Sequence, residues 1–212
     1  MCGIFGSNNI ETFRELYTQN IQRGNFVRSV TKIFPGGLKD DIRIETKHDQ
    51  QLDKEIEENH FCIYYLGHVQ SPTSSVRHFD EKTSHPFSLN GQYLAHNGVL
   101  DNDRQLIEEY NLEGCSDVDS SVILPLKDKI GFNNAFSALQ GTFGCWYYNT
   151  KTGCLRILRS GSTMCYNEGN FSSTLLPDYK YIDEGHVLEY NFTTSTFKNV
   201  DKFELNATPF FL

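Results

Sequence analysis

The order of strand-prone and helix-prone stretches is the feature that most restricts the fold of this chain. From Gly141 onward the sequence consists of short β-prone runs separated by turn signals, of which Asn149-Thr150-Lys151-Thr152-Gly153 is the clearest. The runs cover residues 142–148, 155–159, 164–166, 179–182, 187–190 and 197–200. Such a series of short strands needs a partner layer, because each sheet must bury one of its faces.

The first part of the chain also contains strand-prone runs, with one helix among them. Residues 3–6 predict a short buried strand, and residues 11–22 have the apolar spacing of an amphipathic helix that ends near Gly24. Strands are expected at 26–30 and 42–46, on either side of the turn Pro35-Gly36-Gly37, and at 61–69. The charged stretch 49–59 predicts a helix on the surface.

The middle of the chain predicts one more strand and a group of helices. Residues 93–96 read as a short strand that is broken by a tight turn at Asn97-Gly98. Helices are expected at 101–110, with Asp101 as the capping residue, at 120–130 and at 133–140. Pro125 should kink or end the second of these helices.

Strands at both ends with helices grouped between them indicate an α+β fold in which two sheets pack face to face and helices cover them. The chain has 212 residues, 38% of them hydrophobic, with 16 Phe and 11 Tyr. This length and this aromatic content suit a single domain over residues 1–212 with one sizeable core.

Charge and hydropathy restrict the partners that we expect. The net charge of −8 argues against direct binding to nucleic acid, which needs clustered Lys and Arg. No apolar run is long enough for a membrane helix and no signal peptide is recognisable, so we expect a cytoplasmic protein without a membrane partner. The six cysteines contain no C-x-x-C pair. Apart from Cys2, they are expected to be small apolar core residues, and no metal or other cofactor is expected.

Cys2 is the strongest candidate for a reactive residue. If the initiator Met1 is removed, Cys2 carries a thiol and a free α-amine on one residue. The reference pKa is about 8.5 for a cysteine thiol and about 7.7–8.0 for an α-amine, so a proton can pass between the two groups near neutral pH. An ordinary buried cysteine after a start codon is the alternative that these residues alone leave open.

Several further motifs appear along the chain in a recognisable order. They are Met1-Cys2-Gly3-Ile4-Phe5-Gly6, Gly67-His68, Pro72-Thr73, His85-Pro86-Phe87, His96-Asn97-Gly98-Val99-Leu100, Asp119-Ser120, Gly141-Thr142-Phe143-Gly144, Arg159-Ser160-Gly161-Ser162 and Glu184-Gly185. In this order and at these intervals they resemble the class II glutamine amidotransferase domain of the N-terminal-nucleophile (Ntn) hydrolases. The resemblance implies a four-layer αββα sandwich of two mainly antiparallel sheets.

The resemblance also implies a reaction, the hydrolysis of the L-glutamine side-chain amide with release of ammonia. Cys2 would attack the carboxamide and form a thioester, with its own α-amine as the base. Asn97, through its side chain, and Gly98, through its backbone N–H, would stabilise the oxyanion. Asp119 matches the carboxylate that pairs with the substrate's α-ammonium group, although an aspartate before a helix can also be an N-cap.

One position departs from the family pattern. Where the family commonly has an arginine that binds the substrate's α-carboxylate, this chain has Gln70, which lacks the charge and the forked geometry of a guanidinium group. Thr73 occupies a family contact position, and Arg77 is a candidate to supply the missing charge. His68, His85 and His96 are expected to be core or loop histidines with satisfied hydrogen bonds, and none is assigned as a general base.

Few residues follow the resemblance, which reaches about Tyr190, so an ammonia-accepting synthase is expected on another chain. Two alternatives to a glutaminase subunit remain open. One is an amidase that acts on γ-glutamyl peptides or another amide, a hypothesis motivated by Gln70. The other is a non-catalytic regulatory subunit that has kept the fold.

Overall fold

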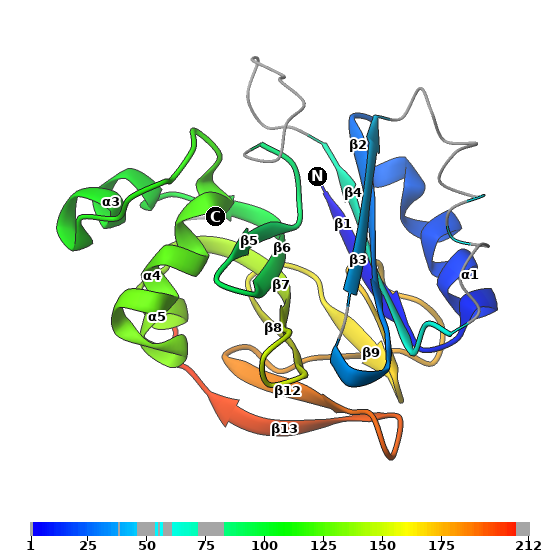
Figure 1. Ribbon diagram of the computed structural model, residues 1–212. Helices are drawn as coiled ribbons and strands as arrows, with labels where there is room; N and C mark the ends of the chain where they lie inside the picture. The colour runs from blue at the N-terminus through cyan, green and yellow to red at the C-terminus, as the bar shows by residue number, and fades with distance from the viewer. Residues whose placement is uncertain are drawn as a thin grey trace.

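The computed structural model describes residues 2–37, 39–45, 54, 56, 61–71 and 83–206. Several expectations from the sequence lie outside these residues: Met1, most of the helix expected at 49–59, Thr73 and Arg77. The described residues form two antiparallel sheets that pack face to face, with helices on both outer sides (Figure 1). The predicted α+β sandwich is therefore confirmed.

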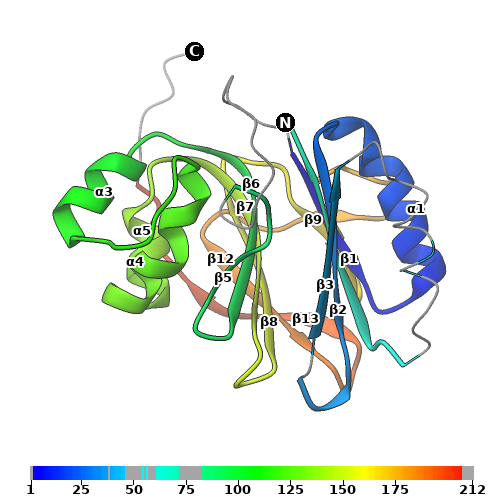
Figure 2. The ribbon, with the colours of Figure 1, turned by 45° about the horizontal axis from the view of Figure 1, so that its top comes forward.

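The first sheet has seven strands and contains the start of the chain. Its strand order is β11 (Lys180–Tyr181), β9 (Cys165–Asn167), β10 (Asn170–Ser172), β1 (Gly3–Ser7), β4 (Tyr64–Gln70), β2 (Val27–Ile33) and β3 (Lys39–Glu45). The turn between β2 and β3 contains the 3-10 helix η2 (Pro35–Gly37). Helix α1 (Ile10–Asn20), which continues into the 3-10 helix η1 (Ile21–Arg23), covers the outer face of this sheet (Figure 2).

The second sheet has six strands. Its order is β13 (Thr196–Lys202), β12 (His186–Asn191), β8 (Cys154–Ser160), β7 (Gly141–Asn149), β6 (Gln92–Leu100) and β5 (Phe87–Leu89). Helices α3 (Asp103–Tyr110), α4 (Ile123–Ile130) and α5 (Phe132–Ala138), with the 3-10 helix η4 (Asp119–Val122), lie on its outer side (Figures 1 and 2).

Alternating side chains on the strands divide the core into three apolar layers. On β1, Ile4 packs between the two sheets, whereas Phe5 packs against α1. On β7, Trp146 lies between the sheets, whereas Tyr147 faces the helices of the second sheet. Both faces of β1 and β7 are thus covered, which explains why these two strands read as nearly continuous apolar runs.

The largest correction to the predicted elements concerns Asn97-Gly98, which does not form a turn. Strand β6 runs through both residues, and Asn97 and Gly98 pair with Gly144 and Phe143 of β7. Gly98 has a φ of 149°, and a Cβ on it would lie 1.9 Å from the carbonyl oxygen of Thr142. Glycine is needed here for a close approach within the sheet, and the sequence alone does not separate this need from a turn.

Smaller corrections concern the helices, one strand limit and two additional strands. Pro125 neither kinks nor ends a helix, because it lies in the first turn of α4, where the missing N–H has no intrahelical partner to lose. The N-cap of α3 is Asn102 rather than Asp101. Phe61 is 82% exposed and lies before β4, and the short strands β5 and β10 were not predicted. None of the helices formed by the described residues is long and apolar enough to cross a lipid bilayer.

Candidate active site

Cys2 lies immediately before β1, beside the end of β4. Because Gly3 pairs with Val69, the next position along each strand places Cys2 next to Gln70. The Cys2 sulfur lies 3.5 Å from both the backbone nitrogen and the carbonyl oxygen of Ser71. Arg23 donates from Nε to the Cys2 carbonyl oxygen at 3.0 Å. These contacts fix the backbone and the thiol of Cys2 at the end of the sheet.

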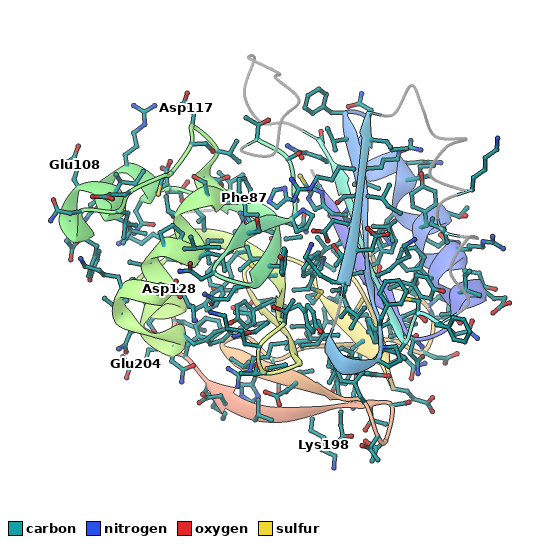
Figure 3. All side chains as sticks on the ribbon, viewed as in Figure 1. Phe87, Glu108, Asp117, Asp128, Lys198 and Glu204 are labelled. Carbon is teal, nitrogen blue, oxygen red and sulfur yellow. The ribbon has the colours of Figure 1, made fainter. Side chains whose placement is uncertain are left out.

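A pocket of about 230 Å³ opens beside the Cys2 thiol. Segments distant in the sequence form its walls, namely the start of β1, the end of β4, the segment before β5, strand β6 and the region around η4. The lining residues are Cys2, Gln70, Ser71, His85, His96, Gly98, Val99, Leu100, Asp103, Asp117, Val118, Asp119 and Ser120. Asp117 lies at the same end of the molecule as the N-terminus, whereas Lys198 and Glu204 lie toward the other end (Figures 1 and 3).

The environment of the Cys2 thiol favours its neutral form. Burial raises the pKa of the thiol, and the negative charge of Asp119 adds to this effect, while the backbone hydrogen bond with Ser71 and the charge of Arg23 partly offset it. A thiol with a raised pKa needs a base before it can act as a nucleophile, since the thiolate is the reactive form.

Asp119 is held by the backbone with its carboxylate at the pocket. Its Oδ2 accepts from the Leu100 backbone N–H at 2.8 Å, and its Oδ1 accepts from the Ser120 backbone N–H at 2.8 Å. Asp119 is the first residue of η4, and the N-cap position belongs to Val118, so the N-cap alternative does not hold. The carboxylate is therefore fixed in the pocket that Cys2 also lines.

Gly98 lines the pocket, and Asn97 precedes it on the same strand. Asn97 is 2% exposed and is not itself part of the pocket lining, and its Oδ1 has no hydrogen-bond partner among the described residues. A role of these two residues at an oxyanion remains a prediction.

A hydrogen bond to the chain fixes the orientation of Gln70. Its Nε2 donates to the carbonyl oxygen of Thr83 at 2.8 Å. Its Oε1 is buried and has no hydrogen-bond partner among the described residues. The side chain is 5% exposed and lines the pocket.

The three histidines of the motifs are buried near this pocket. His96 fits the expectation, because its Nδ1 lies 2.7 Å from Ser120 Oγ and its Nε2 lies 3.3 Å from the Thr142 carbonyl oxygen. For His68 and His85 the expectation of satisfied hydrogen bonds is wrong. Their ring centroids are 4.1 Å apart, and none of their ring nitrogens has a partner with hydrogen-bond geometry among the described residues.

Both rings are neutral. Burial and the neighbouring His96 lower the pKa of His68 to about 3, although the backbone of His96 lies close enough to offset this lowering in part. Burial, followed by the proximity of three other basic groups, those of His68, His96 and Arg43, lowers the pKa of His85 well below its usual value. Neutral imidazoles at this place can both donate and accept a hydrogen bond.

The structure brings together Cys2, Gln70, Gly98 and Asp119 around one pocket, and Asn97 beside it. Thr73 and Arg77 lie outside the described residues. Sequence reasoning missed Arg23, Ser71, Asp103 and Asp117. No local pattern marks these residues, because each reaches the site only through the pairing of β1 with β4 or through the packing of loops.

The other cysteines are free in the structure and only partly match the expectation of core residues. Cys145 and Cys165 are buried, whereas Cys62, Cys115 and Cys154 are only partly buried. Cys154 donates to Glu189 Oε2 at 3.1 Å, and burial together with this carboxylate raises its thiol pKa to about 12. These thiols do not share the pocket of Cys2.

Comparison with solved structures shows the same fold in known enzymes. The chain is similar to glutamine phosphoribosylpyrophosphate (PRPP) amidotransferase from B. subtilis, with a TM-score of 0.71 and 18% identity over 97% of this chain and 50% of that chain. It is also similar to a structure described as the allosteric regulatory enzyme of purine biosynthesis, with a TM-score of 0.68, 18% identity and the same coverage. This chain thus spans about half the length of these two proteins.

A third similar structure is a glutamine aminotransferase class-II domain protein from Silicibacter pomeroyi, with a TM-score of 0.62 and 13% identity. It is matched over 96% of this chain and 100% of that chain. The chain therefore has the fold of class II glutamine amidotransferase domains, as its motifs predicted.

Comparison of the sequence with curated proteins gives one partial match. The chain is 30% identical to 7-cyano-7-deazaguanine synthase 2 from Sulfurisphaera tokodaii over 81 residues, which are 38% of this chain and 18% of the synthase. No protein-family profile matches the chain.

Proposed function

We propose that this chain, which has the fold of class II glutamine amidotransferases, is a glutaminase that releases ammonia from the side-chain amide of glutamine. The supporting observation is the pocket shared by Cys2, Gly98 and Asp119, which come from separate segments of the chain. In this proposal the mature chain starts at Cys2, and the α-amine of Cys2 takes the proton of the thiol.

The reaction proceeds in two steps. The Cys2 sulfur attacks the side-chain carbonyl carbon of glutamine, a C–S bond forms, the C–N bond breaks, and the proton from the thiol leaves with the nitrogen as ammonia. Water then attacks the resulting thioester, and glutamate leaves as the Cys2 thiol is restored. The base is required because burial and Asp119 hold the thiol in its neutral form.

The remaining site residues bind the substrate or stabilise the oxyanion. Asn97 and the Gly98 N–H stabilise the oxyanion that forms in both steps. Asp119, whose carboxylate is already oriented by Leu100 and Ser120, pairs with the substrate's α-ammonium group. Gln70, Thr73 and Arg77 contact the α-carboxyl end of the substrate.

We propose that the ammonia goes to an acceptor enzyme, since ammonia in bulk water is largely protonated and lost. The sequence match to a 7-cyano-7-deazaguanine synthase makes an enzyme of this type the first acceptor to test. We also propose a cytoplasmic location, where a free thiol such as that of Cys2 stays reduced.

The deciding experiment combines intact mass with an assay of glutamate release from L-glutamine by the wild type and by Cys2→Ala. The proposal requires a chain that starts at Cys2, releases glutamate and ammonia in equal amounts, and loses this activity in Cys2→Ala. Cys165→Ala is the matched control, because Cys165 is buried away from the pocket. Glutamate release that persists in Cys2→Ala would refute the proposal.

Asn97→Ala tests the oxyanion site. Loss of one oxyanion donor typically lowers kcat by about 10²–10³-fold, and we expect a loss in this range with little change in KM. Steady-state kinetics of the two proteins provide the measurement. A change confined to KM would instead indicate a residue that binds substrate in the ground state.

Arg77→Ala tests the predicted cation of the site. If Arg77 pairs with the substrate's α-carboxylate, its removal should raise KM for L-glutamine by about tenfold or more, with a smaller effect on kcat. Arg104 lies on helix α3 and does not line the pocket, so Arg104→Ala is a control that removes the same charge elsewhere. An unchanged KM in Arg77→Ala would remove Arg77 from the site.

A further inference from the structure

We propose that His96 and Ser120 are positioning residues that fix the Asp119 carboxylate for the α-ammonium group of the substrate. The inference rests on the proposed function, because it takes Asp119 as the partner of that ammonium group. It adds two side chains to which the proposed function gives no role, and both act through Asp119 rather than on the reacting amide.

The contacts of His96 define which of its ring nitrogens carries the proton. Burial lowers the pKa of His96, although Asp119 and the backbone of Thr142 offset part of this effect, so the ring is neutral near pH 7 and has one N–H. Nε2 lies 3.3 Å from the Thr142 carbonyl oxygen, which only accepts, and the proton is therefore on Nε2. Nδ1 is then an acceptor, and the Ser120 hydroxyl at 2.7 Å donates to it.

The Ser120 hydroxyl has a single proton, and the distances decide which acceptor receives it. Its oxygen lies 2.7 Å from His96 Nδ1 and 3.2 Å from Asp119 Oδ1, so the proton goes to the closer imidazole. The Asp119 carboxylate is instead held by the backbone N–H groups of Ser120 and Leu100, each at 2.8 Å. No Lys or Arg among the described residues lines the pocket, so the charge of Asp119 is left for a ligand cation.

The His96 ring connects two parts of the candidate site. One edge of the ring lies at strand β6, where Nε2 is 2.9 Å from the position that a Cβ on Gly98 would take. The other edge reaches Ser120 in η4, the element that begins with Asp119. His96 and Ser120 are each only 2% exposed, so packing holds both side chains in place. The ring thus sets the position of the carboxylate relative to the strand of the predicted oxyanion donors.

The first test is Ser120→Ala, which removes the hydroxyl that bonds His96 and keeps the backbone N–H that bonds Asp119. Because η4 is then held less firmly against β6, we expect KM for L-glutamine to rise about tenfold and kcat to change less than about threefold. Ser120→Thr keeps a hydroxyl and should restore most of the wild-type KM. Ser121→Ala is the matched control, since Ser121 bonds Ser116 and does not line the pocket of Cys2.

A substrate without the α-ammonium group distinguishes positioning of Asp119 from a general disturbance of the site. Glutaramate has the side-chain amide of glutamine but no α-amine, so it cannot pair with the carboxylate. Ser120→Ala should therefore leave KM for glutaramate within about twofold of the wild-type value. In an Asp119→Asn background, Ser120→Ala should not raise KM for L-glutamine further, because the charge that it positions is already absent.

The protonated nitrogen of His96 can be tested without any substrate. Nitrogen NMR of the histidine rings in the wild-type chain should show His96 with its proton on Nε2. A ring with its proton on Nδ1 would overturn the inference whatever the activity, because Ser120 would then not donate to it. Far-UV circular dichroism shows whether each variant folds.

The outcomes separate the inference from the proposed function. Equal rises of KM for L-glutamine and glutaramate in a folded Ser120→Ala would overturn the inference and leave the glutaminase standing. Absence of Cys2-dependent hydrolysis in the wild type would overturn the proposed function itself. Calorimetric binding of both ligands to Cys2→Ala, with and without Ser120→Ala, makes the same comparison without turnover, and a Ser120→Ala effect that does not depend on the α-amine would again overturn the inference.

Discussion

His68 and His85 form a close pair with tilted rings, and His85 lines the pocket that Cys2 also lines. Both are buried, and none of their ring nitrogens has a hydrogen-bond partner among the described residues. Unpaired polar atoms in a protein interior are costly and often mark places where water or a ligand binds. Because His85 also lines the pocket, these unpaired ring nitrogens lie at the candidate site rather than in a distant part of the core.

Stability should depend on pH through His68. Its pKa is about 3 in the folded chain, against about 6.5 in an unfolded one, so the unfolded state binds more protons at pH values between these two. The free energy of unfolding should therefore fall as the pH drops from 6.5 toward 3, by up to about 1.4 kcal/mol per pH unit from this residue. Urea unfolding of wild type and His68→Leu at several pH values measures this, and the variant should show a shallower dependence. Parallel curves would contradict the assigned pKa.

At the scale of residues, the motifs of the sequence identified side chains that the fold brings together. Cys2, Gly98 and Asp119 were proposed from motifs, and the structure places all three around one pocket. The sequence was insufficient where the role of a residue depends on the orientation of its side chain. The sequence shows a glutamine at position 70, but it does not show that Gln70 Nε2 is already bonded to the carbonyl oxygen of Thr83.

Strand β6 is the element that connects the fold to the site. It is the neighbour of β7 in the second sheet, and it carries His96, Asn97, Gly98 and Val99 past the pocket. The close approach of Gly98 to the Thr142 carbonyl oxygen keeps the two strands paired up to Leu100, where Asp119 accepts from the backbone. The strand thus positions the predicted oxyanion donors relative to Asp119.

Gly98→Ala should disrupt this element. Its Cβ would lie 1.9 Å from the Thr142 oxygen, and the neighbour is backbone, which cannot move away without breaking the pairing. We expect a loss of about 3 kcal/mol in the free energy of unfolding. Gly114→Ala is the control, with a φ of +75° and no atom within 4 Å of the added Cβ, and it should lose only about 1–2 kcal/mol. Chemical unfolding of both variants tests this, and equal losses would contradict the role of the contact.

Elements with a long periodic pattern were predictable, and of the very short strands β9 and β11 were predicted whereas β5 and β10 were not. Helix α1 and strands β7, β8 and β12 lie where their patterns placed them, with limits that differ by a few residues. Strands β5 and β10 have three residues each, which is too few for an alternating pattern, and they form because a longer neighbour pairs with them. The effect of Pro125 was not predictable either. A proline is tolerated in the first turn of a helix, and the sequence did not show that α4 begins at Ile123.

The two sheets are joined by aromatic packing and by a hydrogen bond from Trp146. This residue, the only tryptophan of the chain, is fully buried between the sheets and donates from Nε1 to the carbonyl oxygen of Gly67 at 3.3 Å. Gly67 precedes His68 on β4, so the bond connects the second sheet to the strand that ends at Gln70. The face-to-face arrangement of the sheets is what brings Cys2 and Gly98 to one pocket.

Trp146→Phe should therefore weaken the whole molecule. The change removes the hydrogen bond to Gly67 and leaves unfilled volume between the sheets, so we expect a loss of about 2 kcal/mol in the free energy of unfolding. Far-UV circular dichroism during urea unfolding is the measurement, because the variant has no tryptophan fluorescence. Phe61→Leu, at a position that is 82% exposed, should change stability by less than about 0.5 kcal/mol. Similar values for the two variants would argue against a joining role of Trp146.

Strand β1 has a consequence for how the protein can be engineered. It is paired on both sides, with β10 and β4, and its side chains alternate between the space between the sheets and the side of α1. Inserting or deleting one residue within Gly3–Ser7 would turn the side chains on one side of the change to the opposite face. The register of β1 therefore fixes how many residues separate Cys2 from the rest of the sheet.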